Sequence, residues 1–462
     1  MANLPVDPLP RRPVSLSWRW APASVLAFVA LLPVPGIAET VLVLAALLTV
    51  AWLLRLRIGG RVGALPQASL WTLLGILFLA TWLPQLLSVP DAVQPARALG
   101  KVAAGLRHLP FMCLAAMAVA SSRGRKATFT GLALIAATWS LDALLQALFS
   151  VSPLFWMLDQ FKQLLSGHAL CQAGDVIAAG RINGVFGGCN PKLGQVLASL
   201  SPFLLLVAAG RWGRVGWALA AVLAGACILL SGSRASWVTY ALVLLFTGWR
   251  VLGMRWMVLA MLVALAGAAG LAVGSAQVRE RIVATLPALS GKATDIDAAL
   301  AGRGRIWGGA LCMVREHPIN GVGVRGFREA WPECDPASGR AAAWGDGPAL
   351  HAHQLVLEIL SETGVLGLLL WLAGAALAWR GWRRASRPAR QRAWPAALAL
   401  LVTVFPFNTH LAFHSAFWGA VVLLLAGLYA GALTARAGEE PEANEEDSGV
   451  REGSSKAVSP RK

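Results

Sequence analysis

Two histidines, His351 and His353, stand one residue apart at the start of an apolar stretch, HAHQLVLEILSETGVLG (351–367). Histidine has an unperturbed pKa of about 6.5, which suits the abstraction of a proton near neutral pH. We predict that His353 acts as a general base. His351 is either an accessory side chain or the cap of the following helix with a local hydrogen bond. Because side chains at i and i+2 do not share a helical face and no acidic cluster accompanies the pair, we predict no metal site here.

Three arginines have the chemistry to bind an anion. They are Arg181 in GRINGVFGGCNP (180–191), Arg234 in LLSGSRASW (229–237) and Arg305 in RGRIWGGA (303–310). A guanidinium group matches phosphate oxygens with two parallel hydrogen bonds, and an arginine at membrane depth usually faces an anionic partner or a wet cavity. We therefore predict that the three bind a diphosphate at the level of the lipid headgroups. The alternatives are that Arg234 extends from a helix turn to the headgroups and that Arg305 pairs with a nearby carboxylate.

Two further histidines, His410 and His414, lie in FNTHLAFHSAF (407–417). They are accessory candidates that line the same cavity, or they sit at the membrane interface beside the aromatic residues.

The elements that carry these residues are expected to be membrane-spanning helices. Of 462 residues, 57% are hydrophobic and only 14% are charged, whereas a soluble domain carries about 25% charged residues. Apolar stretches long enough to cross a hydrocarbon core about 30 Å thick recur along the chain. The sequence predicts an all-α polytopic membrane protein with about twelve transmembrane helices. They are expected near 22–37, 39–54, 69–88, 108–121, 127–149, 192–209, 215–231, 235–249, 256–274, 357–379, 394–410 and 413–435.

The net charge of +17 would also suit a protein that binds nucleic acid. However, the chain has 20 Trp and only 2 Tyr, a pattern that fits anchoring at the membrane interface better than base stacking. We therefore expect contacts with membrane lipids and none with nucleic acid.

Lysine and arginine are concentrated in alternate loops between the expected spans, and such loops stay cytoplasmic. Both termini are therefore expected inside, with 436–462 as a disordered tail. Residues 1–274 are expected to hold nine spans and an outer loop at 150–191. A large outer loop at 275–356 and three further spans within 357–435 follow.

The large outer loop is expected to be partly helical. RGRIWGGALCMVRE (303–316) places Ile306, Ala310 and Met313 near one helical face, and HPINGVGVRGF (317–327) has the composition of a glycine-rich turn. Four cysteines fall in the two long outer loops. An oxidising compartment would permit Cys171–Cys189 and Cys312–Cys334 disulfides, although free thiols would give the same sequence.

Four segments together resemble a known family. His353-Gln354, nine residues, and then Gly364-Val365-Leu366-Gly367 look like the H[NSQ]-x9-GxxG motif of the O-antigen ligases. SGSRASW, the pair RGRIWGGA and HPINGVGVRGF, and GRINGVFGGCNP resemble arginine-containing segments that the wider superfamily shares. That superfamily also contains O-antigen polymerases and protein O-oligosaccharyltransferases.

The resemblance implies a lipopolysaccharide-modifying glycosyltransferase of the bacterial inner membrane, with a fold similar to the GT-C transferases and a periplasmic active site. Such enzymes transfer polysaccharide from undecaprenyl diphosphate to lipid A–core. Many GT-C enzymes use a catalytic carboxylate in the first outer loop, often with a divalent cation, whereas the only acid in this expected loop, PVPGIAE, is Glu39. This agrees with a metal-independent mechanism that requires no cofactor. Direct attack on the anomeric carbon predicts inversion there.

Other functions remain open at this point. A polymerase of the same superfamily would extend another lipid-linked glycan, and a protein O-oligosaccharyltransferase would modify a protein. A transporter of lipid-linked sugars or organic anions would also suit twelve spans with arginines at membrane depth. A transporter predicts similar halves of the chain, and no such similarity is visible.

Overall fold

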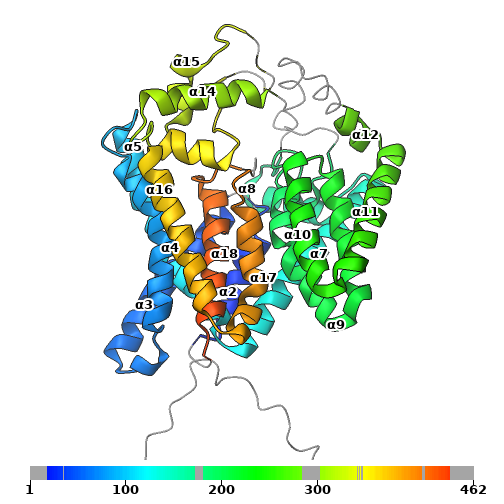
Figure 1. Cartoon of the computed structure of the whole chain (residues 1–462), viewed down its shortest axis with the longest axis horizontal. Helices are drawn as coiled ribbons and strands as arrows, with labels where there is room; N and C mark the ends of the chain where they lie inside the picture. The colour runs from blue at the N-terminus through cyan, green and yellow to red at the C-terminus, as the bar shows by residue number, and fades with distance from the viewer. Residues whose placement is uncertain are drawn as a thin grey trace, which may run out of the picture.

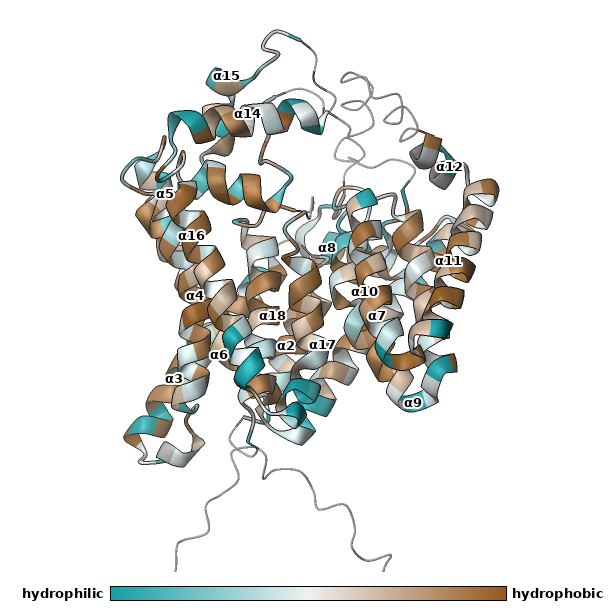
Figure 2. Ribbon diagram, viewed as in Figure 1, coloured by the Kyte–Doolittle hydropathy of each residue, from teal (hydrophilic) through white to brown (hydrophobic). Residues whose placement is uncertain are grey.

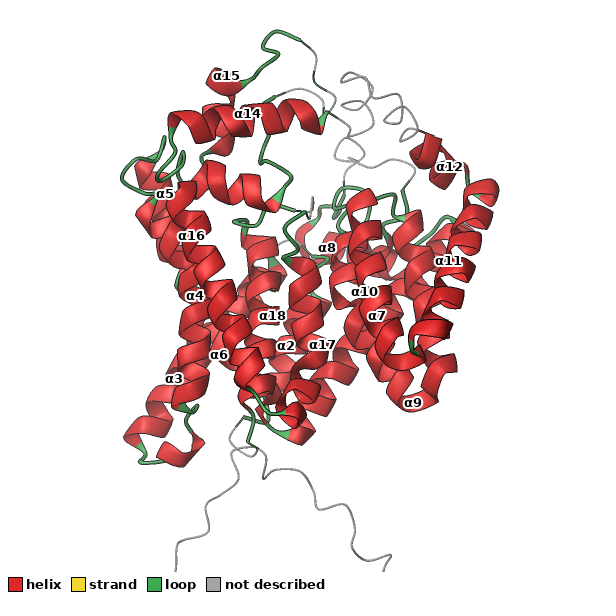
Figure 3. Cartoon of the chain, viewed as in Figure 1, coloured by secondary structure: helices red, strands yellow, loops and turns green. Residues whose placement is uncertain are grey.

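The chain is described by a computed structural model that covers residues 18–34, 36–171, 181–283, 302–340, 342, 344, 347–407 and 411–436. Within these ranges the regular elements are helices and no strand occurs (Figure 3). In chain order they are α2 (Ala21–Ala30), α3 (Ile37–Ile58), η1 (Val62–Ala64), α4 (Ala68–Leu87), α5 (Pro95–Gly105), α6 (His108–Ala120), α7 (Ser122–Phe149), α8 (Pro153–Ser166), η3 (Gly184–Phe186), α9 (Leu193–Leu230), α10 (Arg234–Leu252), α11 (Met254–Gly274), α12 (Ala276–Val283), α14 (Arg303–Glu316), α15 (Phe327–Cys334), α16 (Leu355–Arg384), α17 (Arg387–Thr403) and α18 (Ala416–Thr434).

The expected all-α polytopic membrane fold is confirmed. Nine helical stretches in the described part of the chain are long and apolar enough to cross a membrane, with Pro95–Ala120, which comprises α5 and α6, counted as one. One of them, α9, contains two expected spans, because its helical backbone is interrupted at Trp212 and at Gly213, where φ is 60°. The shorter helices α2 and α17 overlap with the expected spans 22–37 and 394–410, but α2 ends and α17 both begins and ends about seven residues earlier than expected.

The two ends of the helix bundle carry different elements. Helices α5, α8, α12, α14 and α15 gather at one end, which is uppermost in Figure 1 and is called the α14 end from here on. Figure 2 shows apolar residues along the middle of the long helices and hydrophilic residues at the opposite end. The arginine-rich turns lie at that opposite end. They comprise residues 55–61, 122–126, 210–214, 249–255 and 379–392.

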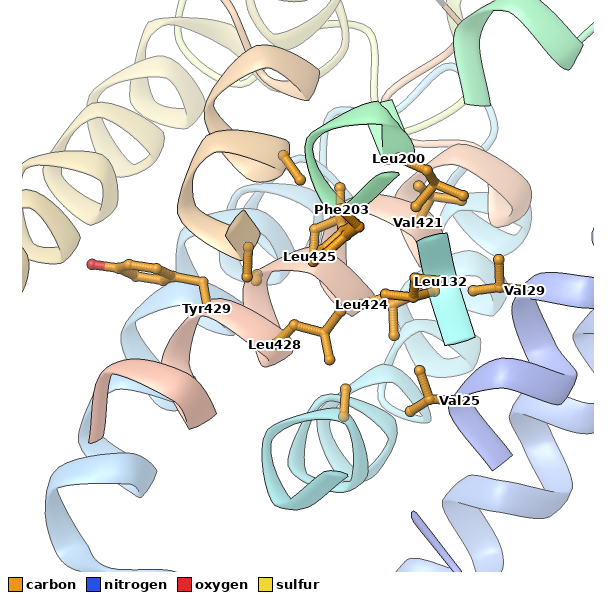
Figure 4. Packing of buried hydrophobic residues seen from close by; sticks show 14 of the residues in the cluster. Val25, Val29, Leu132, Leu200, Phe203, Val421, Leu424, Leu425, Leu428 and Tyr429 are labelled. Atoms are coloured by element: carbon orange, nitrogen blue, oxygen red, sulfur yellow. The ribbon is translucent and has the colours of Figure 1, made fainter. Parts of the chain in front are cut away.

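Helix α18 forms the centre of the bundle, and nearly all of its residues are buried. It lies beside α6, α17 and α4, and in Figure 4 its Leu424 lies near Leu132 of α7 and its Leu425 near Phe203 of α9. Glycines bring α6 especially close, because a Cβ at Gly427 would lie 2.7 Å from the Met112 carbonyl oxygen. Small residues permit such close approach between membrane helices, where apolar burial alone does not drive association.

Helix α16 bends at Gly364, and this bend sets the geometry of the α14 end. Gly364 has φ 66° and ψ −172°, a backbone conformation that is essentially restricted to glycine. The first turns of α16 lie below α14, and the remainder descends through the bundle beside α4 (Figure 1). The predicted helix 303–316 is confirmed as α14, and its residues Ile306, Ala310 and Met313 are buried.

The expected glycine-rich turn 317–327 packs into the bend of α16. The amide of Val365 donates to the Pro318 carbonyl at 2.9 Å, and the amide of Val322 donates to the Ser361 carbonyl at 2.8 Å. A Cβ at Gly364 would lie 2.0 Å from the Ile319 carbonyl oxygen. At Gly364, the first glycine of the GxxG segment, the missing side chain therefore leaves room for the backbone of the turn 317–327 and not for a neighbouring helix.

Substitution of Gly364 by Ala should destabilise the protein. The backbone conformation alone costs about 1–3 kcal/mol for a residue with a Cβ, and the overlap with Ile319 adds to that cost. Gly381→Ala is the matched control, because Gly381 lies in the same helix and a Cβ there would meet nothing within 4 Å. Thermal denaturation of the purified variants in one detergent should show a lowered midpoint for Gly364→Ala and an unchanged or raised midpoint for Gly381→Ala. Equal midpoints would mean that the bend is not fixed at Gly364.

Candidate functional site

His353 lies directly before α16 and is held in an unusual backbone conformation. Its φ is 51°, in the left-handed region that residues with a Cβ rarely occupy. Its imidazole ring contacts that of His351, with ring centroids 3.7 Å apart. Ala352, between the two histidines, is fully buried in the cluster that also contains Ile306 and Ala310 of α14. The histidine pair is therefore fixed by packing against α14.

Gln354 caps α16 and attaches its start to another segment. The side-chain carbonyl of Gln354 accepts a hydrogen bond from the Leu357 amide, as an N-cap residue does. Its side-chain nitrogen donates to the Pro406 carbonyl at 2.9 Å, next to the end of α17. The orientation of the His353 backbone is thus determined by contacts on both sides.

A buried cluster of Glu358, Glu362 and His414 lies one and two turns into α16. His414 Nδ1 is 3.0 Å from Glu362 Oε2, and the His414 amide donates to Glu358 Oε1 at 3.1 Å. Both carboxylates are at most 1% exposed. The Arg325 amide also donates to Glu362 Oε2, at 2.9 Å. Glu362 therefore links α16, the turn 317–327 and the segment before α18.

The cluster was not predicted from the sequence, although a signal for it exists. Two acids at i and i+4 in an otherwise apolar stretch share a helical face and require a buried partner. The three side chains place one potential ligand atom each within 4.8 Å of one another and could hold a cation. Glu358 Oε1 and Glu362 Oε2 already accept hydrogen bonds from the protein, so we interpret the cluster as structural.

Arg181 and Arg234 lie next to each other at the α14 end. Arg234 is the first residue of α10, and the Ile182 amide donates to the Leu230 carbonyl at 3.4 Å, which places Arg181 beside the α9–α10 turn. The third arginine of this group is Arg303, the first residue of α14. Burial and the guanidinium charges of Arg234 and Arg181 lower the pKa of Arg303. These three residues are called the arginine group below.

Two helix N-termini coincide with the arginine group. Neither Ser233 before α10 nor Gly302 before α14 caps its helix through a side chain. The first amides of a helix and its dipole attract anions. The positive ends of α10 and α14 therefore add to the charges of Arg234 and Arg303.

Arg305 lies elsewhere, on a different face of α14. Its guanidinium forms a two-pronged ion pair with Asp335, at 2.8 and 2.6 Å, and donates to the Ala337 carbonyl at 2.9 Å. The guanidinium also lies over the Trp344 ring, 5.4 Å from its centroid. Residues at i and i+2 of a helix point about 200° apart, so Arg303 and Arg305 do not face the same side. The alternative expectation for Arg305, pairing with a nearby carboxylate, matches this geometry.

The remaining expected residues have varied positions. His414 is buried against Glu362, and this contact, rather than an interfacial position, fixes its ring. His410 lies outside the described residues.

Disulfides join Cys171 to Cys189 and Cys312 to Cys334. The second disulfide connects α14 to the end of α15 and so supports the helix that carries Arg303.

Comparison with protein families gives one match. Residues 219–372 match the family model described as O-antigen ligase. The matched segment contains Arg234, Arg303 and His353, together with the bend of α16, and it excludes Arg181 and His414. No curated protein matches the chain.

The Arg305–Asp335 pair should make stability depend on pH in a defined direction. Hydrogen bonds from Arg305 hold the pKa of Asp335 below its usual value, so the pair stabilises the folded state fully above the ordinary Asp pKa of about 3.9. This contribution should be lost as the pH falls below that value toward the pKa of the folded state. The pair is only partly buried, so removal of one partner should cost less than the about 3–5 kcal/mol that breaking a fully buried pair costs.

Asp335→Asn should therefore lower the thermal midpoint of the purified protein at neutral pH. The difference from wild type should shrink as the pH is taken below about 4. Denaturation midpoints measured across this range test the prediction. A difference that stays constant with pH would show that the ionised form of Asp335 does not stabilise the fold.

Proposed function

We propose that this chain, whose residues 219–372 match the O-antigen ligase family model, transfers polysaccharide from undecaprenyl diphosphate to lipid A–core. The observation that carries this proposal is the arginine group, in which two helix N-termini and three guanidinium groups meet at the α14 end. Such a concentration of positive charge suits the diphosphate of a lipid-linked donor.

The donor leaves as a lipid diphosphate, which is already a stable anion, so the reaction requires no general acid. Negative charge grows on the leaving phosphates in the transition state, and preorganised cations stabilise it there. In this proposal Arg181, Arg234 and Arg303 bind those phosphates. Arg305 instead holds the loop after α15 through Asp335.

His353 is proposed to take the proton from the acceptor hydroxyl. Its left-handed backbone is maintained by contacts on both sides, and strained conformations of this kind concentrate at active sites. Attack of the acceptor oxygen on the anomeric carbon expels the diphosphate from the opposite face. The product is therefore expected with inverted anomeric configuration.

We further propose that the α14 end faces the periplasm from the inner membrane, with both termini in the cytoplasm. The arginine-rich turns lie at the opposite end of the bundle (Figure 2), and short loops rich in arginine stay cytoplasmic. Two disulfides at the α14 end agree with an oxidising compartment.

The function is tested by following transfer with purified full-length protein, undecaprenyl-diphosphate-linked glycan and lipid A–core in nanodiscs. Product on lipid A–core should form at the same rate with and without EDTA. His353→Ala should lower kcat by about 10²–10⁴-fold, the usual contribution of a general base. Lengthening of the lipid-linked glycan without product on lipid A–core would indicate an O-antigen polymerase. Glycolipid movement between leaflets without any transfer would indicate a transporter.

The same assay separates the arginine group from other arginines of α14. Arg303→Gln should lower kcat by about 10²-fold, the order of magnitude for loss of one preorganised transition-state contact. Arg315→Gln is the matched control, since Arg315 lies exposed in the last turn of the same helix. Equal activity of the two variants would remove Arg303 from the proposed diphosphate site.

A further inference from the structure

A pocket opens at the α14 end, between α4, α5, α6 and the start of α18. Its cavity volume is about 270 Å³. One water requires roughly 10–15 Å³ of such space, so the pocket has room for a monosaccharide. The arginine group does not line it. The lining residues that matter here are Trp82, Gln85, Lys101, Arg107, His108 and His414.

His108 lines this pocket, and its ring contains a buried acceptor. Its side chain is buried, with the residue 9% exposed, and Nδ1 lies 3.0 Å from the Gly105 carbonyl oxygen. A carbonyl can only accept, so Nδ1 carries the proton and Nε2 of the neutral ring is an acceptor. Nε2 is buried and meets no donor among the described residues. A buried acceptor without a donor costs free energy, which a ligand hydroxyl would recover.

Two cationic side chains line the same pocket. Lys101 lies on α5, and Arg107 directly precedes His108. Glu39 pairs with one terminal nitrogen of Arg107, while the buried Arg107 Nε has no acceptor within the described part of the chain. The His108 nitrogen can accept a hydrogen bond from a sugar hydroxyl, and the excess of positive charge in the same pocket suits a phosphate or carboxylate group on that sugar.

An aromatic wall completes the pocket. Trp82 is fixed by a hydrogen bond from its indole nitrogen to the Val102 carbonyl at 2.9 Å, and it stacks on Phe78 with ring centroids 5.7 Å apart. Rigid aromatic surfaces next to hydrogen-bonding groups are typical of pockets for small polar ligands. Trp82 can therefore contact the apolar face of a sugar ring while Lys101 and His108 bind its polar substituents.

The surroundings of the pocket indicate a ligand attached to a membrane lipid. Helix α5 borders the pocket, and Leu99 within it and Leu106 directly after it are 53% and 51% exposed. The start of α3 exposes Ile37 close to Glu39 in sequence. Apolar side chains beside a cationic pocket fit the boundary between headgroups and acyl chains. A soluble phosphate would make no use of them.

The pocket shares a residue with the bend of α16. His414 lines the pocket, and its Nδ1 contacts Glu362, which in turn fixes the turn 317–327. We propose that this pocket binds an anionic sugar of a membrane glycolipid. The further statement that this glycolipid is the acceptor rests on the proposed function.

The proposal is tested by binding of diphosphoryl lipid A to the full-length protein in nanodiscs, with phosphatidylglycerol and soluble glucosamine phosphate as comparison ligands. His108→Asn keeps a donor near the Gly105 carbonyl and removes the Nε2 acceptor, and Lys101→Met removes the charge. Each variant should weaken lipid A binding by about tenfold, as expected for loss of one hydrogen bond to a charged or buried group. Arg97→Met, one turn earlier on α5 and outside the pocket lining, should bind as wild type does.

Wild-type affinity in both variants would overturn the pocket as a binding site. Equal affinity for phosphatidylglycerol would overturn the claim that the pocket recognises a sugar. Equal affinity for glucosamine phosphate would overturn the claim that the sugar is attached to a lipid.

In the transfer assay, His108→Asn should raise KM for lipid A–core and leave kcat and the donor KM unchanged. Unchanged acceptor KM despite weakened binding would overturn the acceptor assignment. Weakened lipid A binding in the variants, with no transfer by wild type, would support the pocket and contradict the proposed function.

Discussion

The geometry of the α14 end depends on one interruption of a helix. At Gly364 the regular backbone of α16 opens, and the carbonyls of Pro318 and Ile319 accept hydrogen bonds from the Val365 and Leu366 amides. A polar turn can lie so close to a membrane helix because its backbone groups are paired in this way. The Glu362 carboxylate adds hydrogen bonds to the same junction. Without the bend, the first turns of α16 would not lie below α14.

That arrangement brings together charges that repel one another. Arg181, Arg234 and Arg303 lie close enough for the first two to lower the pKa of the third. Like charges held together in a partly buried site destabilise the free protein and favour an anionic ligand. The Arg305–Asp335 pair and the Cys312–Cys334 disulfide stabilise the segment that carries Arg303. We infer that they help to maintain an arrangement that repulsion would otherwise open.

Much of this arrangement could be predicted from the sequence. Apolar stretches identified the spans, because a hydrocarbon core imposes length and composition on any helix that crosses it. The spacing of Ile306, Ala310 and Met313 identified α14, because a helix that packs on one side repeats its apolar residues at that interval. The position of Gly364 at a special point of the backbone was not predicted. The GxxG spacing is equally typical of close packing between two helices. Only the path of the turn 317–327 shows that Gly364 instead forms a bend against which this turn packs.

The partners of the charged residues could not be predicted from the sequence. Arg303 and Arg305 are separated by one glycine, and composition gives no reason to choose between them. The choice depends on Asp335, thirty positions away from Arg305 in the chain, and on which face of α14 meets the α9–α10 turn. Glu358 and Glu362 were identifiable as a pair that needs a partner, but His414 becomes that partner only through the packing of α18. Long-range contacts of this kind leave no local pattern.

A structure of the full-length protein in a nanodisc with undecaprenyl diphosphate would test the central claim most directly. We expect the diphosphate to contact Arg181, Arg234 and Arg303 near the first turns of α10 and α14, with Arg305 still bound to Asp335. Binding of the diphosphate away from the arginine group, or release of Arg305 from Asp335 to reach it, would contradict the account.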